Sequence, residues 1–213
     1  MHQVVAKQGC FAASSIGMSI FLTGRNAHSA HPEAGNSPAL ATAQIIQMLE
    51  NLPKALESFS LVTVVQAELG KIAFGMTPGE AVVRATLRTF DNVRNISLQK
   101  MAEKQASEIA ISFGLGIGFE YQEDFAASYN HPEAFGILMD AAKALDSDLQ
   151  EVQVPFRWSE DFGLFSDYAK SMLFGLGSGL AQPQLHEPNF DFPDELIPTG
   201  ISVFSKIVER LHR

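Results

Sequence analysis

The sequence predicts a mixed α/β (α+β) protein in two parts, and three observations support this class. Residues 14–125 alternate apolar, β-branched runs with segments of helical spacing in the order β-α-β-β-α-β. Residues 126–213 combine two helical patterns with short apolar runs and a glycine-rich turn. With 46% hydrophobic and 18% charged residues among 213, the chain has enough apolar side chains to build a packed core.

The first part begins with a strand and a helix. Residues 19–23 (SIFLT) predict a strand that Gly24 stops, and a loop rich in turn-forming residues follows over 31–38. Ser37 is suited to cap, and Pro38 to begin, a helix that runs to about residue 51.

Two further strands, a helix and a last strand complete this part. Residues 60–69 and 81–90 predict an antiparallel pair, and residues 115–121 predict the last strand. The spacing of apolar side chains predicts a helix over 93–113, with a buried face made of Ile96, Leu98, Met101, Ile109 and Ile111. This order is the ferredoxin-like split arrangement, a four-stranded sheet with two helices on one face.

The second part predicts helices over 131–145 and from 194 or 198 to 211, with strands at 149–154 and 171–176. These are too few strands for a closed, doubly wound sheet. We therefore expect the sheet to need strands that this chain does not contain.

Charge and composition exclude several classes of protein. With 15 Lys and Arg against 24 Asp and Glu, and a net charge of −9, the chain is unsuited to neutralise nucleic-acid phosphates. The single cysteine, Cys10, cannot form an internal disulfide, which favours a reducing, cytoplasmic compartment. The start lacks the pattern of a signal peptide, and no apolar run is long enough for a membrane span.

No local motif completes a metal site. The chain has no H-x-x-x-H on a predicted helix and no cysteine pair, so any metal site has to be assembled from distant positions. Glu160 and Asp161 are adjacent carboxylates suited to acid–base work, although a structural role is the better interpretation. Cys10 lies among small apolar residues, which favours packing over reactivity.

Two segments and one strand carry a resemblance to a known family. Residues 24–33 (GRNAHSAHPE) resemble the G-x-x-x-H-x-A-x-P signature of the aminoacylase and carboxypeptidase-type metallopeptidases. Residues 159–162 (SEDF), 173–177 (LFGLG) and 185–192 (LHEPNFDF) resemble the closing motifs of its amidohydrolase branch, which includes aminoacylases, hippurate hydrolases and auxin-conjugate hydrolases. Residues 85–88 (ATLR) match a strand of the same branch.

The resemblance implies an organisation and a set of site residues. Residues 14–125 would form the lid, or dimerisation, domain, residues 1–13 a remnant of the catalytic domain, and residues 126–213 its C-terminal segment. His186 would be a metal ligand and His28 an oxyanion-stabilising donor that reaches a neighbouring subunit. Arg88 would bind the carboxylate of the substrate, with a solvent-facing position in the sheet as the alternative.

The family's chemistry is implied in the same way. Its members bind two divalent metals, usually zinc or a similar ion, and hydrolyse the amide bond of an N-acyl amino acid or a peptide-like small molecule, generally as homodimers. This chain departs from the pattern, because it contains no H-x-C-G-H-D-like segment, and Gly75 stands where the family has a substrate-holding asparagine. His2 lies too close to Gly9 to match the family's mid-chain ligand. One ligand position cannot hold a metal tightly, so we expect the chain alone not to hydrolyse amides.

Two alternatives remain open from the sequence. The chain can be a non-catalytic dimerising or ligand-binding protein that keeps the lid scaffold. It can also be a ferredoxin-like ligand-sensing module joined to an α/β tail, although that interpretation does not explain the segment around His186.

Overall fold

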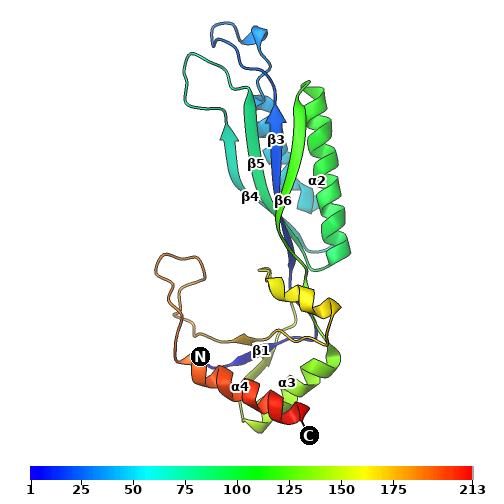
Figure 1. The fold of residues 1–213 in the computed structure, drawn as a ribbon, viewed down its shortest axis with the longest axis vertical. Helices are drawn as coiled ribbons and strands as arrows, with labels where there is room; N and C mark the ends of the chain where they lie inside the picture. The colour runs from blue at the N-terminus through cyan, green and yellow to red at the C-terminus, as the bar shows by residue number, and fades with distance from the viewer. Residues whose placement is uncertain (213) are drawn as a thin grey trace. The chain divides into compact units, whose positions relative to one another are not determined.

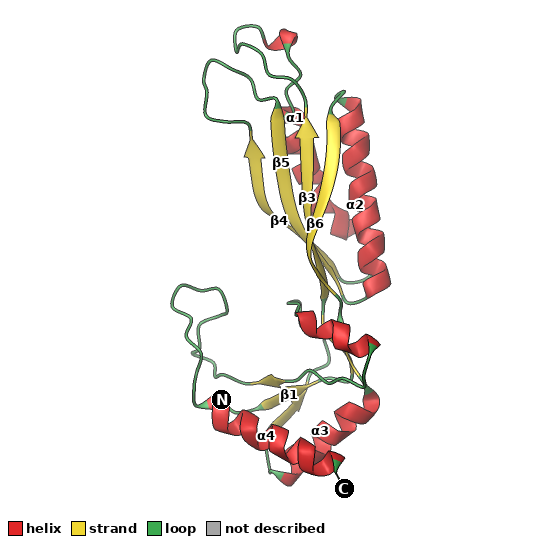
Figure 2. Ribbon diagram, in the orientation of Figure 1, coloured by secondary structure: helices red, strands yellow, loops and turns green. Residues whose placement is uncertain are grey.

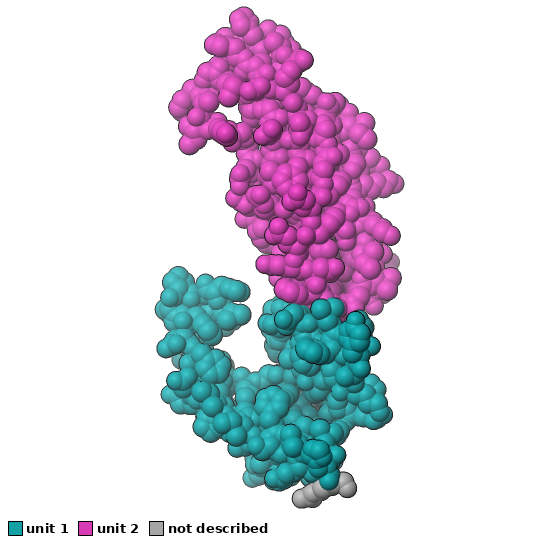
Figure 3. Space-filling model, in the orientation of Figure 1, with its two compact units in different colours: residues 1–12, 128–213 teal, residues 13–127 magenta. Residues whose placement is uncertain are grey.

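The structure, a computed structural model, describes residues 1–212. Ala13–Ala127 form one compact unit (unit 2), and Met1–Ala12 with the chain from Ser128 onward form another (unit 1; Figure 3). Helices and strands occur in both units (Figure 2), which confirms the mixed α/β class. Within the described residues, no helix is both long enough and apolar enough to cross a membrane.

Unit 2 is built on a four-stranded antiparallel sheet with the order β4-β5-β3-β6 (Figure 1). Its strands are β3 (Ser14–Thr23), β4 (Ser60–Leu69), β5 (Glu80–Thr89) and β6 (Gly116–Phe125). The bounds of β4 agree with the sequence prediction, and those of β5 differ by one residue. β3 begins five residues earlier than predicted, because Ser14 pairs with Thr89 and extends the ladder.

Two helices, α1 (Ala39–Asn51) and α2 (Asn92–Ser112), cover one face of this sheet. Alternate residues of β3 and β5 point to that face and are buried, as the two-residue period of a strand requires. They pack against apolar side chains of both helices. The largest fully buried members of this core are Met18, Ile20, Leu22, Ile45, Leu49, Val83, Leu87 and Leu98.

Helix α1 begins one residue later than predicted. Pro38 stands at the N-cap position without a side-chain cap, but the hydroxyl of Ser37 accepts the backbone N–H of Ala39 at 3.3 Å. A short 3₁₀ segment, η2 (Leu52–Ala55), continues the turn through Pro53.

The buried face of α2 differs from the predicted one. Leu98 and three alanines at four-residue spacing, Ala102, Ala106 and Ala110, form the buried ridge. The prediction that Ile96 and Ile111 face the core is wrong, since they are 52% and 71% exposed. The alanine ridge lets the helix backbone approach the sheet closely, which turns these larger side chains outward.

Unit 1 contains a three-stranded sheet of short strands in the order β8-β1-β9, namely β8 (Leu149–Glu151), β1 (Val4–Ala6) and β9 (Gly175–Leu176). Helices α3 (Pro132–Ala144) and α4 (Leu196–Leu211) pack on it through Leu138 and Val203, which join Val4 and Ala6 in a small core. A second pair, β2 (Gly9–Ala12) with β7 (Ser128–Asn130), and the 3₁₀ helix η3 (Asp161–Asp167) complete the unit.

The predicted strand over residues 171–176 is mostly wrong, because only Gly175 and Leu176 pair with β1. The residues before them are held by a side chain instead. The buried amide of Asn130 donates to the carbonyl oxygens of Lys7 and Leu173, each at 2.8 Å, and accepts the N–H of Leu173 at 2.7 Å. Asn130 therefore takes the place of a strand ladder in this part of unit 1.

Candidate functional site

The His28 loop follows β3 at one end of the unit 2 sheet and is held by two backbone segments. Arg25 and Asn36 exchange two backbone hydrogen bonds of 2.9 and 2.7 Å, which close the loop at its base. On the other side, Thr77 donates its backbone N–H to the carbonyl oxygen of Ala27 at 2.8 Å, and its hydroxyl accepts the N–H of Ala27 at 2.9 Å. His28 therefore sits on a backbone that is fixed from both sides.

The base of the loop leaves no room for a side chain at Gly24. A Cβ atom there would lie 2.0 Å from the carbonyl oxygen of Asn36 and 2.8 Å from Cδ2 of Leu115. Gly79 is similar, since a Cβ would lie 2.8 Å from the backbone nitrogen of Asn26. The first glycine of the G-x-x-x-H pattern is thus required by the close approach of two backbone segments.

The ring of His28 makes one defined hydrogen bond. Its Nδ1 accepts the backbone N–H of Ala30 at 3.1 Å, and the ring is otherwise exposed. Because an accepting Nδ1 carries no proton, the neutral ring has its N–H at Nε2. His28 therefore presents an N–H donor to the solvent. His31 is also exposed, with its ring 6.2 Å from that of His28 and its Nδ1 3.5 Å from Glu33.

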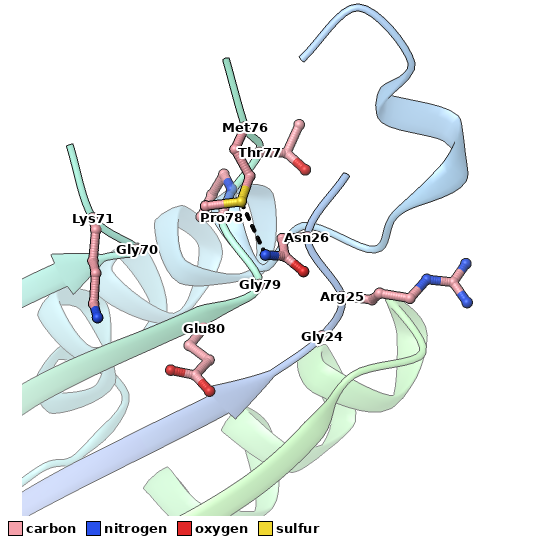
Figure 4. A pocket seen from close by; sticks show the side chains of 10 residues that line it. All are labelled: Gly24, Arg25, Asn26, Gly70, Lys71, Met76, Thr77, Pro78, Gly79 and Glu80. Atoms are coloured by element: carbon pink, nitrogen blue, oxygen red, sulfur yellow. Dashed lines mark hydrogen bonds between the residues drawn. The ribbon is translucent and has the colours of Figure 1, made fainter. Parts of the chain in front are cut away.

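A pocket of about 360 Å³ lies beside the loop, between the chain after β3 and the segment that joins β4 to β5. Figure 4 shows Asn26 turned toward Met76, where its Nδ2 lies 3.0 Å from the Met76 sulfur, and Arg25 directed away from Asn26. Lys71 and Glu80 also line this pocket. The side chains bring opposite charges to its wall and do not converge on one point.

Gly75 lies at the tip of the segment that carries Thr77. Its carbonyl oxygen accepts the backbone N–H of Ser29 at 3.0 Å, and a Cβ at this position would meet no atom within 4 Å. The glycine therefore supplies a backbone acceptor beside His28 but no side-chain donor. Its neighbours Ile72 and Phe74 are 98% and 97% exposed.

Arg88 lies on the sheet face that the helices do not cover and is half-buried. Burial lowers the pKa of its guanidinium from the ordinary value, while the carboxylate of Glu123 raises it. Arg88 pairs with Ser15, and the strand then runs eight residues further to Thr23 before the His28 loop begins. That length is roughly 27 Å, so one copy of unit 2 does not bring Arg88 and His28 together.

His186 belongs to unit 1, in an exposed turn between Gln184 and Phe190. Its backbone has φ of +73°, a left-handed conformation that a side chain other than glycine adopts at a cost of about 1–3 kcal/mol. The turn is closed by the N–H of Glu187, which donates to the carbonyl oxygen of Gln184 at 3.0 Å. The turn thus presents the imidazole on the surface of unit 1.

The donor set for a metal is not complete. Over residues 1–212, no group of three or more His, Cys, Asp or Glu side chains is placed to hold a metal ion. Glu160 and Asp161 are exposed at the start of η3, and Nδ1 of His2 lies 2.8 Å from the hydroxyl of Thr199. His186 alone does not fit the coordination that a tightly held divalent ion requires.

Sequence reasoning missed the residues that shape the His28 loop. Thr77 clamps Ala27, and the side-chain amide of Asn36 donates to the carbonyl oxygens of Phe113 and Gly114 at 3.1 and 2.9 Å. A Thr-Pro and an Asn-Ser pair mark turns in the sequence, but their partners are far along the chain. Only the folded sheet brings those partners together.

The chain is similar to proteins that are named as hydrolases. The sequence profile of Peptidase family M20/M25/M40 matches residues 34–210. "Putative amidohydrolase YhaA" of Bacillus subtilis (strain 168) is 26% identical over 99% of this chain, and N-acetyldiaminopimelate deacetylase of Streptococcus gordonii is 23% identical over 97%. The chain spans 55% of the length of each of these two relatives.

A solved structure shares the fold. The YXEP protein of Bacillus subtilis, described as a dinuclear metal-binding peptidase from the M20 family, aligns with a TM-score of 0.76 and 19% identity. The alignment covers 97% of this chain and 52% of that protein. Since the family profile covers most of the chain, the chain belongs to Peptidase family M20/M25/M40, in its amidohydrolase branch.

Proposed function

We propose that this chain serves a metal-dependent, aminoacylase-type amidohydrolase that cleaves the amide bond of an N-acyl amino acid or a related small substrate. The observation that carries the proposal is the match of the family profile over residues 34–210, a range that includes both the 85–88 strand and the closing segment with His186. In this proposal, residues 14–125 act as the lid domain, and residues 1–13 and 126–213 belong to the catalytic domain.

His28 is proposed as the donor that stabilises the oxyanion of the tetrahedral intermediate. Its Nε2–H faces solvent, and its Nδ1 bond to Ala30 fixes the tautomer that can donate. A donor held on a fixed backbone loses little conformational freedom when substrate arrives. This arrangement supports a role for His28 as a positioned hydrogen-bond donor rather than as a histidine that only stabilises the turn.

Arg88 is proposed as a carboxylate-binding residue for the acyl-amino-acid substrate. The guanidinium fork matches a carboxylate with two parallel hydrogen bonds. Because Arg88 lies roughly 27 Å along the strand from the start of the His28 loop, the two side chains of one copy cannot act on one small substrate.

His186 is proposed as one ligand of a divalent metal, zinc or a similar ion, whose other ligands lie outside the described chain. The metal would act as a Lewis acid toward the amide carbonyl when it is bound. The left-handed backbone at His186 supports the proposal, because strained residues concentrate at functional sites.

The chain is proposed to form a homodimer through residues 14–125, so that His28 of one copy serves the site of the other. β4 is an outer strand of the unit 2 sheet, with its backbone edge open and with Val65 and Leu69 exposed. Open strand edges pair readily with another chain. Light scattering after gel filtration should give the mass of a dimer.

The variant Val65→Lys places a positive charge on β4, at the edge where the two copies would pair. It should therefore weaken the dimer and shift the measured mass toward that of a monomer. Val93→Lys is the matched control, since Val93 is also exposed but lies at the start of α2. A wild-type chain that stays monomeric at high concentration contradicts the dimer.

The incomplete ligand set predicts that the purified chain alone holds no stoichiometric zinc and does not hydrolyse N-acyl amino acids. Metal analysis and release of free amino groups from N-acetyl amino acids measure both properties. A purified chain with one or two equivalents of zinc and robust hydrolysis would show that the ligand assignment is wrong.

The alternative is a non-catalytic dimerising or ligand-binding protein, and the lack of a three-residue metal cluster over residues 1–212 favours it. Sequencing the DNA and the transcript upstream of Met1 separates the two. An H-x-C-G-H-D-like segment there, in frame or displaced by a frameshift, supports the enzyme. An unrelated sequence supports the binding protein.

A further inference from the structure

The uncovered face of the unit 2 sheet carries charged side chains on both sides of strand β3. This strand lies between β5 and β6 (Figure 1). On the uncovered face β3 presents the small residues Ser15, Gly17 and Ser19, because the intervening Ile16 and Met18 point to the helices and are buried. The larger side chains of this face therefore come from the two neighbouring strands.

On one side of β3, strand β5 supplies two arginines. Arg84 and Arg88 point to the uncovered face, four residues or about 13 Å apart along the strand. The guanidinium of Arg84 donates to the side chains of Gln66 and Glu68 on β4, at 2.7 and 3.2 Å. Arg88 is half-buried and pairs across the ladder with Ser15. The charge of Arg84 is thus matched by β4, whereas Arg88 lies further along the strand.

On the other side of β3, strand β6 contains a β-bulge level with Ser15. Gly17 pairs with Gln122 and Ser15 pairs with Phe125, so β6 takes three steps where β3 takes two. Within the bulge, the exposed Glu123 has φ of +52°, a left-handed conformation that is unfavourable for any residue except glycine. Bulges of this kind redirect a side chain and are frequent beside functional sites.

The bulge brings the carboxylate of Glu123 within electrostatic range of Arg88. One row of the sheet runs from Arg88 through Ser15 to Phe125, and Glu123 lies two residues before Phe125. Two strand spacings, about 10 Å, separate the backbones of β5 and β6 in this row. Burial lowers the pKa of the Arg88 guanidinium, and the carboxylate of Glu123 raises it. A cation and an anion therefore flank the same part of β3.

We infer that Arg88 and Glu123 form a subsite for a ligand that carries both a carboxylate and an ammonium group. The inference rests on the proposed role of Arg88 and narrows its substrate class. An N-acyl amino acid with an uncharged side chain would bring its carboxylate close to that of Glu123, and like charges repel. An N-acyl derivative of a basic amino acid, such as lysine or ornithine, offers its carboxylate to Arg88 and its side-chain ammonium to Glu123.

A purely structural ion pair is the alternative role for Glu123. An exposed pair of charges adds little to stability. Glycine adopts the left-handed backbone of position 123 without strain, whereas glutamate does not. The strained backbone therefore favours a role for the Glu123 side chain over a stabilising one.

Binding of two acylated amino acids to the full chain tests the inference. The probes are Nα-acetyl-L-lysine and Nα-acetyl-L-norleucine, which share the acyl group and the carboxylate and differ in the side-chain ammonium. NMR titration of the isotope-labelled chain, followed at the Nε–H of Arg88, gives both dissociation constants. We expect the wild type to bind the lysine derivative about fivefold more tightly, and Glu123→Gln to bind both probes equally.

Glu120→Gln is the matched control, because Glu120 lies on the same strand opposite Ser19, about 13 Å from the row of Ser15. It removes the same charge and should keep the preference. A loss of the preference in both variants would assign it to the net charge of the chain and overturn the inference. Glu123→Gly, which suits the left-handed backbone, should melt no lower than the wild type and still lose the preference, so it separates binding from folding.

The remaining outcomes separate the inference from the proposed function. A preference that survives Glu123→Gln overturns the inference. If the wild type binds both probes equally and each shifts the Arg88 resonance, Arg88 keeps its proposed role as a carboxylate-binding residue, while the inference is wrong. If neither probe shifts that resonance, the proposed role of Arg88 and the inference are both wrong.

Discussion

Replacing Gly24 with alanine should destabilise unit 2 and displace the His28 loop. A carbon and an oxygen that are not bonded approach to about 3.3 Å, whereas the new Cβ would lie 2.0 Å from the Asn36 carbonyl oxygen. The two segments therefore have to separate by more than 1 Å. That shift lengthens the Arg25–Asn36 hydrogen bonds from 2.9 and 2.7 Å to beyond bonding distance.

The magnitude follows from those contacts. Loss of two backbone hydrogen bonds costs about 2 kcal/mol, and the clash with Leu115 adds about 1 kcal/mol more. Alanine also lowers the conformational entropy of the unfolded chain, which offsets this loss of stability by less than about 1 kcal/mol. A net loss of about 2–3 kcal/mol lowers the melting temperature of a unit of this size by roughly 8–15 °C.

Thermal unfolding followed by far-ultraviolet circular dichroism measures this loss, while Trp158, the single tryptophan of the chain, reports on unit 1. We expect the dichroism transition to shift and the fluorescence transition to stay. Gly75→Ala and Gly118→Ala are matched controls, since a Cβ at either position meets nothing within 4 Å. If Gly24→Ala melts within about 2 °C of the wild type, the inference that the Asn36 backbone leaves no room for a Cβ atom at Gly24 is wrong.

Two further predictions concern the buried amide of Asn130 in unit 1 and the phenol of Tyr121 in unit 2. Asn130→Ala should lower the free energy of unfolding of unit 1 by about 3 kcal/mol, because it removes three hydrogen bonds from a buried amide, and urea unfolding followed by Trp158 fluorescence measures the loss. Burial, together with a hydrogen bond to Glu103, raises the pKa of Tyr121 to about 12. Since the unfolded phenol titrates near pH 10, Tyr121 stabilises unit 2 below pH 10, and this contribution is lost as the pH rises from about 10 to about 12.

Each has a control. Gln150→Ala removes an exposed amide from β8 and should leave the urea midpoint in place, so an equal effect of both variants would show that the buried network around Asn130 is not what stabilises unit 1. For Tyr121, tyrosinate absorbance should contain a late step near pH 12 that Tyr121→Phe removes. A titration in which the variant keeps that late step contradicts the assignment.

Local sequence patterns predicted β4 and β5 well because each is a run rich in β-branched and apolar residues. The bounds of β4 were predicted to the residue, and those of β5 to within one. The buried face of α2 was predicted only in part: Leu98 is buried, but Ile96 and Ile111 are exposed, because hydropathy ranks isoleucine above alanine while close helix–sheet packing selects small side chains. Helical periodicity alone does not encode that distance between backbones.

The sequence offers candidate site residues but not their arrangement in space. The G-x-x-x-H pattern identified His28 and its glycine, and the structure explains the glycine by steric contact with Asn36. The distance between Arg88 and His28 depends on strand register, which pairs Arg88 with Ser15 at the opposite end of β3. The failed strand at 171–174 depends on Asn130, which lies more than 40 residues away and offers no local pattern.

The pairing of β2 with β7 makes unit 2 an exchangeable module. Ala12 and Ser128 are register partners in that pair, so the 115-residue segment between them leaves and returns at one point of unit 1. A short hairpin turn can span the same gap without stretching the backbone. Insertions of this geometry are gained, lost or swapped without disturbing the host fold. Unit 2 can therefore change its length and its loop residues while unit 1 keeps its own core.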